Sequence, residues 1–599
     1  MRSPLRHLIW LALLAGALPA QAKPVTITFI HFNDLHAHLT AHWDVVREGD
    51  KSRVTERGGL ARSATLIKRI RKDNPNSVLM NIGDTYHGGV EALFTNGNAI
   101  VDPVNALGID VGVPGNWDYA YGPMVTRLRY ADLGPFERRI LSRVNNMMTP
   151  TGDIKRPNFP NLAANVSFVM PPWKIGKTFL PATLVKDIGG VKVGFIGISS
   201  DIVPRMHEML AIGLSFMQGE DKYRALINRH AKALRDEGAQ LVVVMSELGI
   251  QKNYQLAQGL EPGAVDVVFS AHTHEAIFTP LTSSSGALVV EAGNDGYVGR
   301  MDITLDDGKV KTRHWKLLAV DRTLPEDPEM KRLVAQARAP FLVAHPNIKL
   351  PMAFQDQVLT QSIDTVVGHV KGALDRRNAL ESTFNASFAE ALRKRAHSQI
   401  AITPGFRFDS VIAEPGEKLE DNTVAKGVIT VEDVYRFFPV SYTISTAKIS
   451  AGNLKELMET ALDSVFAADA FAQSGGWFEG FAGLRIGLDL AKPKGERVRS
   501  LVLKNDGHTL ENNDTLSAVG CSRPMDKPDV LCSYDGFTVI ESFDNPATHQ
   551  PWTIADLFSD MLKQGEILPA TLSITDLSHT PQWPSNAYVQ PLTGVKSEK

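Results

Sequence analysis

The chain has 599 residues, of which 43% are hydrophobic and 22% are charged, and its formal net charge is −3. A chain of this length is too long for one hydrophobic core, so we expect at least two domains. The small net charge gives no support to a role that depends on bulk attraction to a nucleic-acid polymer or a membrane surface.

The first 22 residues have the pattern of a secretory signal peptide. A short basic stretch precedes an apolar run from residue 8 to about 18, and Ala-Gln-Ala follows at 20–22. This pattern predicts cleavage after residue 22 and a periplasmic protein that is not held at a membrane, with an uncleaved anchor as the alternative. In an oxidising compartment the only two cysteines, Cys521 and Cys532, favour a loop-closing disulfide.

From residue 23 to about 325, apolar runs typical of buried strands alternate with amphipathic stretches typical of helices. The strand-like runs are VTITFI (25–30), SVLMNIG (77–83), VKVGFIGIS (191–199), LVVVMSE (241–247), VDVVFSA (265–271) and ALVVEAG (287–293). Helical patterns at 59–73 and 223–238 lie between them. This alternation predicts an α/β domain with mostly buried strands.

The remaining chain has a different pattern. Residues 326–360 form a proline-flanked connector that contains one helical stretch. From 361 to about 590, helical patterns at 384–396 and 453–471 mix with strand-like runs at 398–403, 484–490 and 499–504. We therefore expect a second, α+β domain with its own core, followed by a loose tail at 591–599.

Polar clusters end the strand-like runs of the first domain, where open α/β sheets bind ligands. In chain order they supply Asp34 and His36 (NDLH), Asp84 (GDT), Asn116 (GNWD), Glu247 (SELG), and His272 and His274 (HTH). Hard oxygen donors mixed with imidazoles suit Mn²⁺, Fe²⁺, Zn²⁺ or Mg²⁺, and seven donors suit two ions better than one. Asp84, in a tight turn after a glycine, is the candidate to bridge both ions.

In this order the clusters resemble the motifs of the calcineurin-like metallophosphoesterases, and within them the secreted 5'-nucleotidase family. FPNLAANV (159–166) and KGVITVEDVYRFFP (426–439) are similar to the same family, and the resemblance covers about 25–590. It implies a four-layer α/β sandwich followed by an α+β substrate-binding domain. It also implies two divalent ions, one held by Asp34, His36, Asp84 and His274, the other by Asp84, Asn116, His272 and Glu247.

Two positions depart from the family pattern. At 247 the family usually has histidine; the glutamate here can still ligate and favours harder ions, so Mn²⁺ is the ion we expect. At 117 the family usually has a histidine beside the substrate, and this chain has tryptophan. An indole N–H donates a hydrogen bond but is not a general acid near neutral pH. The pattern therefore favours a leaving group that needs little protonation, such as a thiolate or persulfide.

The chain resembles the thiosulfohydrolase branch of the bacterial sulfur-oxidation system, which also has tryptophan at this position. The segments DPEMKRLVAQARAPFL (327–342) and ITPGFRFDS (402–410) are similar to the same branch. That branch releases sulfate from a cysteine-S-sulfonate on a sulfur-carrier protein. It usually has histidine where this chain has Asn116 and Glu247. Two alternatives stay open: a 5'-nucleotidase or 2',3'-cyclic-nucleotide phosphodiesterase, and a non-catalytic binding protein derived from this fold.

The expected substrate contacts come from both domains. Beside the reacting group we expect Asn116, Trp117, Asp118 and Arg407. The resemblance places Arg407, in TPGFRFD, on the substrate anion, although a surface ion pair is the alternative. The glycine-rich segment 473–489 and the segment SYDGF (533–537) supply candidate aromatic contacts: Trp477, Phe478, Phe481 and Phe537. Each of the first three aromatics could instead fill the second core.

Overall fold

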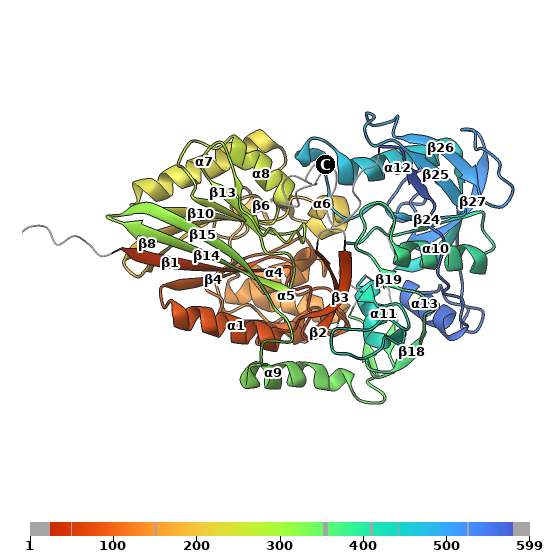
Figure 1. The fold of residues 1–599 in the computed structure, drawn as a ribbon, viewed down its shortest axis with the longest axis horizontal. Helices are drawn as coiled ribbons and strands as arrows, with labels where there is room; N and C mark the ends of the chain where they lie inside the picture. Colours follow the sequence, from red (N-terminus) through yellow and green to blue (C-terminus); the bar gives the residue numbers. More distant parts are fainter. Residues whose placement is uncertain are drawn as a thin grey trace, which may run out of the picture.

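The computed structural model describes residues 24–48, 51–149, 152–351, 357–407, 411–440, 442–523 and 526–578. The predicted signal peptide and the predicted tail lie outside these residues. Within them, no helix combines the length and the apolar character needed to cross a bilayer. Figure 1 shows two domains side by side, with the N-terminal domain in red to light green and the C-terminal domain in green to blue.

Two sheets form the centre of the N-terminal domain, with strand orders β15-β14-β1-β4-β5 and β12-β13-β11-β10-β8-β7. The first contains β1 (Val25–Asn33), β4 (Ser77–Ile82), β5 (Val111–Val113), β14 (Tyr297–Asp306) and β15 (Lys309–Ala319). The second contains β7 (Thr183–Ile188), β8 (Val191–Ile198), β10 (Leu241–Ser246), β11 (Val267–Ser270), β12 (Leu281–Thr282) and β13 (Leu288–Glu291). All six predicted strands are confirmed.

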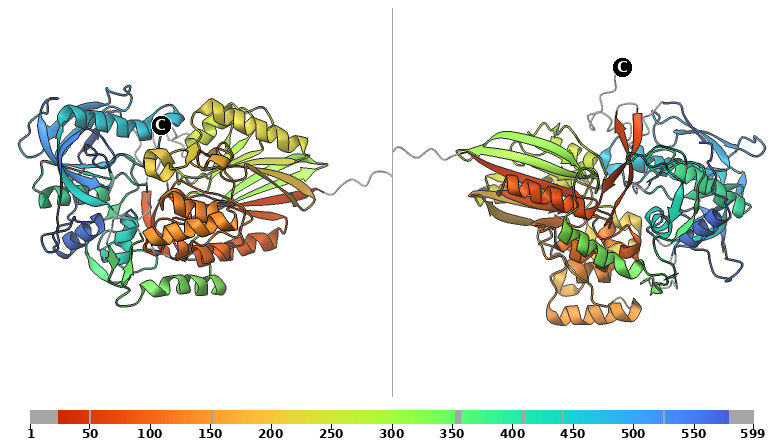
Figure 2. Two further views of the ribbon diagram at one scale, coloured as in Figure 1. Left: turned by 180° about the vertical axis from the view of Figure 1, so that it is seen from behind. Right: turned by 60° about the horizontal axis from the view of Figure 1, so that its bottom comes forward.

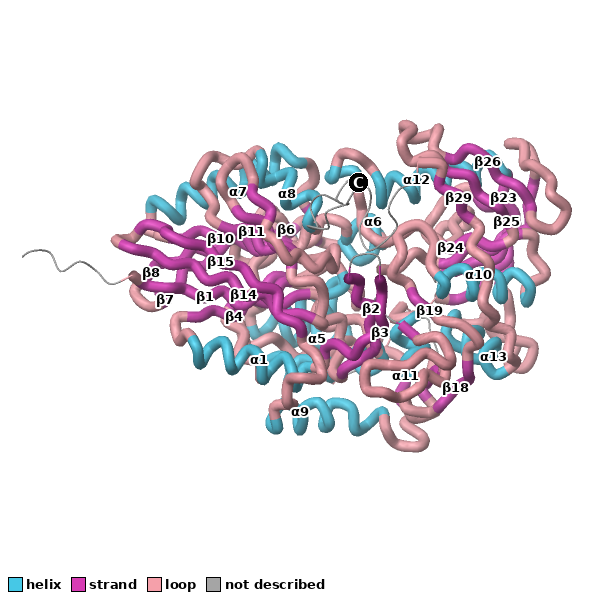
Figure 3. The backbone as a smooth tube through the Cα atoms, in the orientation of Figure 1, coloured by secondary structure: helices cyan, strands magenta, loops and turns pink. Residues whose placement is uncertain are grey.

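Alternate side chains of these strands pack into different layers, because successive residues of a strand face opposite sides. Phe29 of β1 faces the second sheet, where its ring lies 5.5 Å from that of Phe269. Its neighbour Ile30 joins the core under α1 (Leu60–Asp73). The far face of the second sheet is covered by α7 (Glu220–Asp236) and α8 (Ile250–Gln258). The result is the predicted four-layer arrangement of helix, sheet, sheet and helix, also visible in Figure 3.

The carboxyl ends of the parallel strands lie between the two domains. β1, β4 and β5 are mutually parallel, and so are β8, β10, β11 and β13. In Figure 1, β1 starts at the far left and runs toward the C-terminal domain. The loops that follow these strands, which carry the polar clusters of the sequence, therefore meet at the interface between the domains.

The C-terminal domain has a five-stranded sheet, a three-stranded sheet and a separate core. The strand orders are β24-β20-β27-β23-β28 and β26-β25-β29. The strands are β20 (Ile400–Thr403), β23 (Thr443–Ser450), β24 (Gly480–Ala482), β25 (Leu484–Leu488), β26 (Val498–Leu503), β27 (Thr515–Ser522), β28 (Phe537–Ser542) and β29 (Ile574–Asp576). The helices are α10 (Thr383–Arg395), α11 (Val431–Phe437), α12 (Ala451–Phe466) and α13 (Ile554–Lys563). The predicted helices and strands of this domain are confirmed.

The predicted connecting helix is α9 (Pro328–Arg338), and it packs on the N-terminal domain. Its residues Met330 and Val334 are buried in the core that also contains α1. The sequence positions of the domain boundaries, about 325 and 361, remain predictions.

A β-hairpin that the sequence analysis did not predict makes contacts between the two domains. β2 (Ala41–Glu48) pairs with β3 (Lys51–Gly58) and reaches the C-terminal domain, where Trp43 and Val54 pack on a small cluster of buried residues around Leu419. Asp44 forms an ion pair with Arg377. The hairpin thus extends from the N-terminal domain and contacts the C-terminal domain through apolar packing and an ion pair.

Candidate dinuclear metal site and substrate cavity

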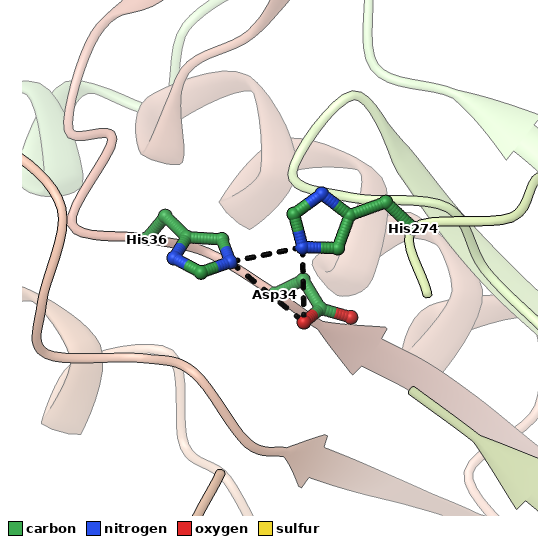
Figure 4. Close-up of side chains that lie close together, drawn as sticks. All are labelled: Asp34, His36 and His274. Atoms are coloured by element: carbon green, nitrogen blue, oxygen red, sulfur yellow. Dashed lines mark hydrogen bonds and ion pairs between the residues drawn. The ribbon is translucent and has the colours of Figure 1, made fainter. Parts of the chain in front are cut away.

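The first group of candidate ligands consists of Asp34, His36 and His274 (Figure 4). His274 Nε2 lies 3.4 Å from Asp34 Oδ1 and 2.9 Å from His36 Nε2. The other oxygen of Asp34 accepts hydrogen bonds from the Asn33 side chain (2.6 Å) and the His272 amide (3.1 Å). These bonds turn Oδ1 toward the two imidazoles, so three donors from two strand ends face one point.

The second group consists of Asp84, Glu247 and His272, whose ligand atoms lie within 4.8 Å of one another. Glu247 Oε2 lies 3.7 Å from His272 Nδ1. Asp84 Oδ2 is also 3.8 Å from His36 Nε2 of the first group, so Asp84 stands between the two groups, as a bridging ligand must. Glycine is required beside it, since a Cβ on Gly115 would lie 2.2 Å from Asp84 Oδ1.

Most of these ligands have a strained backbone. Positive φ angles occur at Asp34 (47°), His36 (45°), Asp84 (48°), His272 (86°) and His274 (56°). For a residue with a side chain this conformation costs roughly 1 to 3 kcal/mol, and such residues concentrate at functional sites. The loops after β1, β4 and β11 are therefore shaped for the direction of their side chains rather than for local stability.

The donor set fits two divalent cations. Within the described part of the chain, Asp34 Oδ1, Asn116 Oδ1, both Glu247 oxygens and His272 Nδ1 are buried without a hydrogen-bond partner. Burial and the neighbouring carboxylates raise the pKa of Asp84 and of Glu247 well above their usual range. Burial and Arg407 hold the pKa of His272 well below its usual range. Acceptors that lack donors and repel one another are stabilised by cations.

Asp118 has a different role from the expected one. Its carboxylate accepts hydrogen bonds from the backbone amides of Thr85 (3.1 Å), Tyr86 (3.0 Å) and Gly115 (2.9 Å). It is buried and does not line the cavity described below. The prediction that Asp118 lies beside the reacting group is wrong, because backbone amides already surround its carboxylate. Asp118 positions the loops that carry Asp84 and Asn116.

Trp117 lines the cavity beside Asn116. Its ring stacks on His87, with centroids 4.8 Å apart and planes 21° apart, and its centroid lies 5.8 Å from that of Phe406. Burial lowers the pKa of His87 to about 3, so this imidazole is neutral at physiological pH. Neither ring of the stacked pair is an effective general acid near neutral pH.

The candidate ligands open into a cavity of about 830 Å³ between the domains. Arg407 and Trp477 of the C-terminal domain line this cavity, and their contact with a substrate remains a prediction. Arg407 donates hydrogen bonds to the carbonyls of His272 (3.2 Å) and Gly476 (3.1 Å), and its guanidinium carbon lies 4.5 Å from the centre of the Trp477 ring. Gly475 packs against the candidate ligand His272, since a Cβ at position 475 would lie 2.6 Å from His272 Nε2.

Three predicted aromatic contacts are wrong. Phe478, Phe481 and Phe537 are buried in the C-terminal core and do not line the cavity. Phe478 precedes β24, Phe481 lies within it and Phe537 begins β28, and all three rings pack into the core of this domain. The cavity instead contains Phe406, Tyr442 and Tyr534, which the sequence analysis did not single out. Phe406 lies in TPGFRFD beside Arg407, and Tyr534 lies in SYDGF, so both segments reach the cavity, the second through a residue other than the predicted Phe537.

The predicted disulfide is not formed in the structure, where Cys521 and Cys532 are free, buried thiols. They are nevertheless adjacent: the Cys521 amide donates to Cys532 Sγ at 2.8 Å, and the Cys532 amide donates to the Cys521 carbonyl at 2.6 Å. Both line the cavity. The sulfur of Cys532 is thus engaged as a hydrogen-bond acceptor, and a covalent bond between the two remains a prediction.

Comparison with known proteins agrees with this architecture. Residues 27–276 match the family model described as calcineurin-like phosphoesterase, and residues 366–520 match the one described as 5'-nucleotidase, C-terminal domain. The snake venom 5'-nucleotidase of Naja atra is 23% identical over 79% of this chain and 84% of its own length. The 5'-nucleotidase of Bos taurus is 24% identical over 82% of this chain and 80% of its own.

Two solved structures share the fold across nearly the whole chain. The sulfate thiohydrolase SoxB of Thermus thermophilus has a TM-score of 0.71 at 18% identity and covers 94% of this chain and 98% of its own. A 5'-nucleotidase precursor, also of Thermus thermophilus, has a TM-score of 0.66 at 21% identity and covers 93% of this chain and 100% of its own. Both domain models and the site geometry lead to one assignment: the chain belongs to the calcineurin-like phosphoesterases with a 5'-nucleotidase C-terminal domain, which are metal-dependent hydrolases.

Proposed function

We propose that this protein is a periplasmic, dinuclear-metal thiosulfohydrolase that releases sulfate from a cysteine-S-sulfonate on a sulfur-carrier protein. The observation that carries the proposal is the stacked pair of Trp117 and His87 at the cavity wall. Two neutral rings stand where a leaving group would otherwise receive a proton.

The chemistry of the leaving group follows from this pair. Hydrolysis converts R–S–SO₃⁻ and water into R–SH, sulfate and one proton, so the sulfur–sulfur bond breaks and the electron pair stays with the thiolate. A thiol has an ordinary pKa of about 8.5, so its thiolate departs without a general acid. An alkoxide is far more basic and departs slowly without one. The indole N–H of Trp117 is suited to orient an anionic group rather than to protonate it.

The N-terminal domain would supply the metal ligands, and the C-terminal domain would supply the arginine that binds the substrate anion. The two ligand groups, joined at Asp84, would hold two divalent ions, with Mn²⁺ favoured by the carboxylate at 247. When bound there, such ions supply Lewis-acid activation of water and neutralise charge on the transferred group. Arg407 stands across the cavity, and its planar fork suits a sulfonate.

The side chains that line the cavity favour a substrate presented on a flexible arm. Beyond the ligands its lining includes Met124, Met206 and Met209, whose thioethers adapt to irregular apolar partners. The similarity in fold to the sulfate thiohydrolase SoxB supports the same reading.

A nucleotide substrate is the second candidate, as for a 5'-nucleotidase or a 2',3'-cyclic-nucleotide phosphodiesterase. The specific observation in its favour is the set of aromatic rings in the cavity, Phe406, Tyr442 and Trp477. Stacking of a base on such a ring is worth about 1 to 3 kcal/mol. In the structure Phe406 and Tyr442 already stack on each other, 5.8 Å apart with planes at 10°, and a base would have to compete with this contact.

The deciding experiment uses the full mature chain loaded with Mn²⁺. A carrier peptide bearing a cysteine-S-sulfonate, AMP and 2',3'-cyclic AMP are assayed in parallel, with Asp84→Asn as the inactive control. We expect about two ions per chain and release of sulfate above the control. Turnover of AMP with sulfate release at the level of the control would replace this proposal with a nucleotidase. Fewer than about one ion per chain and no turnover would support a non-catalytic binding protein.

The Trp117→His variant separates the two hydrolases further. Histidine restores a side chain able to protonate a leaving group, so activity on AMP should rise relative to activity on the S-sulfonate. An unchanged ratio between the two substrates would remove the role assigned to Trp117.

A further inference from the structure

Large apolar side chains are exposed together on one protruding part of the N-terminal domain. They lie on α5 (Pro135–Met148), on the segment 169–175 and on the loop 209–212: Phe136, Ile140, Val144, Met147, Met148, Val169, Met170, Trp173, Ile175, Met209 and Ile212. Phe136, Met147 and Trp173 are 78%, 79% and 69% exposed. More than half of the exposed large apolar residues in the described chain belong to this set, which we name the α5 face.

Helix α5 has almost no partner. Asn145 is its only buried residue, and the helix packs on α4 (Pro123–Tyr130) alone among its larger contacts. Phe136, Ile140 and Val144 recur every four residues, so they lie on one side of the helix. In the right-hand view of Figure 2 the orange helix at the bottom edge, α5, stands away from both sheets. An apolar helical stripe normally faces a core, and this one faces outward.

The three segments form one surface rather than three separate ones. Lys174 forms an ion pair of 2.8 Å with Glu137 of α5, which holds the Trp173 segment beside the helix. The amide of Val169 donates to the carbonyl of Gly213 at 3.1 Å, which joins the same segment to the loop of Met209 and Ile212. A contiguous apolar surface of this kind on a soluble chain marks a place of contact with another phase or molecule.

The α5 face is also basic. The three segments of the face together contain four Lys and Arg against one Glu, although the whole chain has a net charge of −3. Arg139 and Arg143 are exposed on α5, each three residues after an apolar residue of the stripe, and Lys177 is exposed beside Ile175. Apolar and cationic side chains therefore alternate on the same surface.

We propose that the α5 face binds the surface of an anionic lipid bilayer. An amphipathic helix with Phe, Ile and Met on its exposed side, arginines interleaved and a tryptophan at the adjacent tip is the pattern of interfacial membrane contacts. A second copy of the chain fits less well, because two-fold pairing would place the same basic residues against each other. Attraction to anionic headgroups follows from the local charge, which the net charge of the chain conceals.

The α5 face reaches the mouth of the cavity. Met148, Met209 and Ile212 line the cavity and belong to the face as well. Docking would therefore turn the mouth toward the bilayer, and substrates would enter along the membrane surface. The proposal does not depend on which reaction the cavity performs, since its measured quantity is binding to lipid.

The test is co-sedimentation of the full mature chain with vesicles of phosphatidylcholine alone or with about one-third phosphatidylglycerol. We expect binding to the anionic vesicles, weakened by salt. The double variant Phe136→Ser/Trp173→Ser should lower the bound fraction about tenfold on anionic vesicles. Arg139→Gln/Arg143→Gln should lower it on these vesicles and leave the phosphatidylcholine result unchanged.

The matched control is Phe278→Ser/Leu572→Ser, which removes two exposed apolar side chains outside the α5 face. This control should bind lipid as the unaltered chain does. All variants should keep their thermal unfolding midpoint and their turnover of soluble substrate. The proposal is overturned if the unaltered chain does not bind anionic vesicles, or if the control loses binding to the same extent. A dimer in sedimentation velocity that Phe136→Ser/Trp173→Ser breaks would assign the face to a second copy, and binding to polyglutamate without binding to vesicles would assign it to an acidic protein.

Discussion

The backbone amide of Trp117 donates a hydrogen bond of 2.8 Å to Asp84 Oδ1. This bond links the loop after β5 to the carboxylate that stands between the two ligand groups. The next residue, Asp118, holds the same two loops together through three backbone amides. The position of Asp84 is therefore set by backbone groups and by a carboxylate that does not itself face the cavity.

Replacement of Asp118 by alanine should weaken metal binding without removing a ligand. Three buried amides would lose a charged acceptor, at a cost of about 3 kcal/mol or more in the free energy of unfolding. Chemical denaturation and Mn²⁺ titration measure the two effects, and Asp118→Asn should give an intermediate result. The exposed Asp132→Asn variant is the control. Unchanged Mn²⁺ affinity in Asp118→Ala would contradict the positioning role.

Glu247→Ala should reduce the metal content from about two ions to about one per chain. Both oxygens of Glu247 are buried beside His272 without a hydrogen-bond partner among the described residues, so the variant removes a ligand and not a structural hydrogen bond. Elemental analysis after reconstitution measures the stoichiometry. Glu247→His should retain two ions and move the preference from Mn²⁺ toward Zn²⁺. Two tightly bound ions in Glu247→Ala would exclude Glu247 as a ligand.

Metal binding should release protons and weaken as the pH falls. Burial and mutual repulsion raise the pKa of Asp84 and of Glu247 in the metal-free protein, so protons occupy these carboxylates at a higher pH than usual. Ions must displace those protons, and acid therefore favours the metal-free state. Titration of Mn²⁺ into weakly buffered protein should show acidification that becomes larger as the starting pH is lowered toward the usual carboxylate range. The Asp84→Asn variant should release fewer protons; equal release would remove Asp84 from the site.

Turnover of an anionic substrate should decline as the pH rises through about 7. Burial raises the pKa of Glu479, a cavity residue, to about 7, while a hydrogen bond from the Tyr534 hydroxyl acts in the opposite direction. Glu479 is thus mostly neutral below this pH and negative above it, where it repels a sulfonate or phosphate. The repulsion should appear as an increase in KM with rising pH, and Glu479→Gln should flatten the dependence of KM on pH. A profile that keeps its shape in Glu479→Gln would assign the dependence to another group.

Much of the fold could be read from local patterns. The runs at 25–30, 77–83 and 241–247 became β1, β4 and β10, because an apolar run bounded by polar turns has few stable alternatives to a buried strand. The polar residues after these runs were correctly brought together, since parallel strands present their carboxyl ends at one edge. Asp84, His272 and His274 line one cavity, and their division between two ions came from the resemblance to a known family.

The tertiary structure decided what each side chain of a correctly chosen segment faces. Phe478 and Phe537 were expected in the cavity and lie in the core, whereas Phe406 and Tyr534 from the same kinds of segment line the cavity. The carboxylate of Asp118 accepts hydrogen bonds from backbone amides rather than facing the cavity. The β2–β3 hairpin contacts the C-terminal domain, and no pattern in the sequence predicted this contact. The apolar side chains of α5 are exposed, although an apolar helical stripe normally faces a core. A side chain is buried only where another part of the chain, distant in sequence, covers it. A local pattern shows that a side chain is apolar, but it does not show which other segment packs on it.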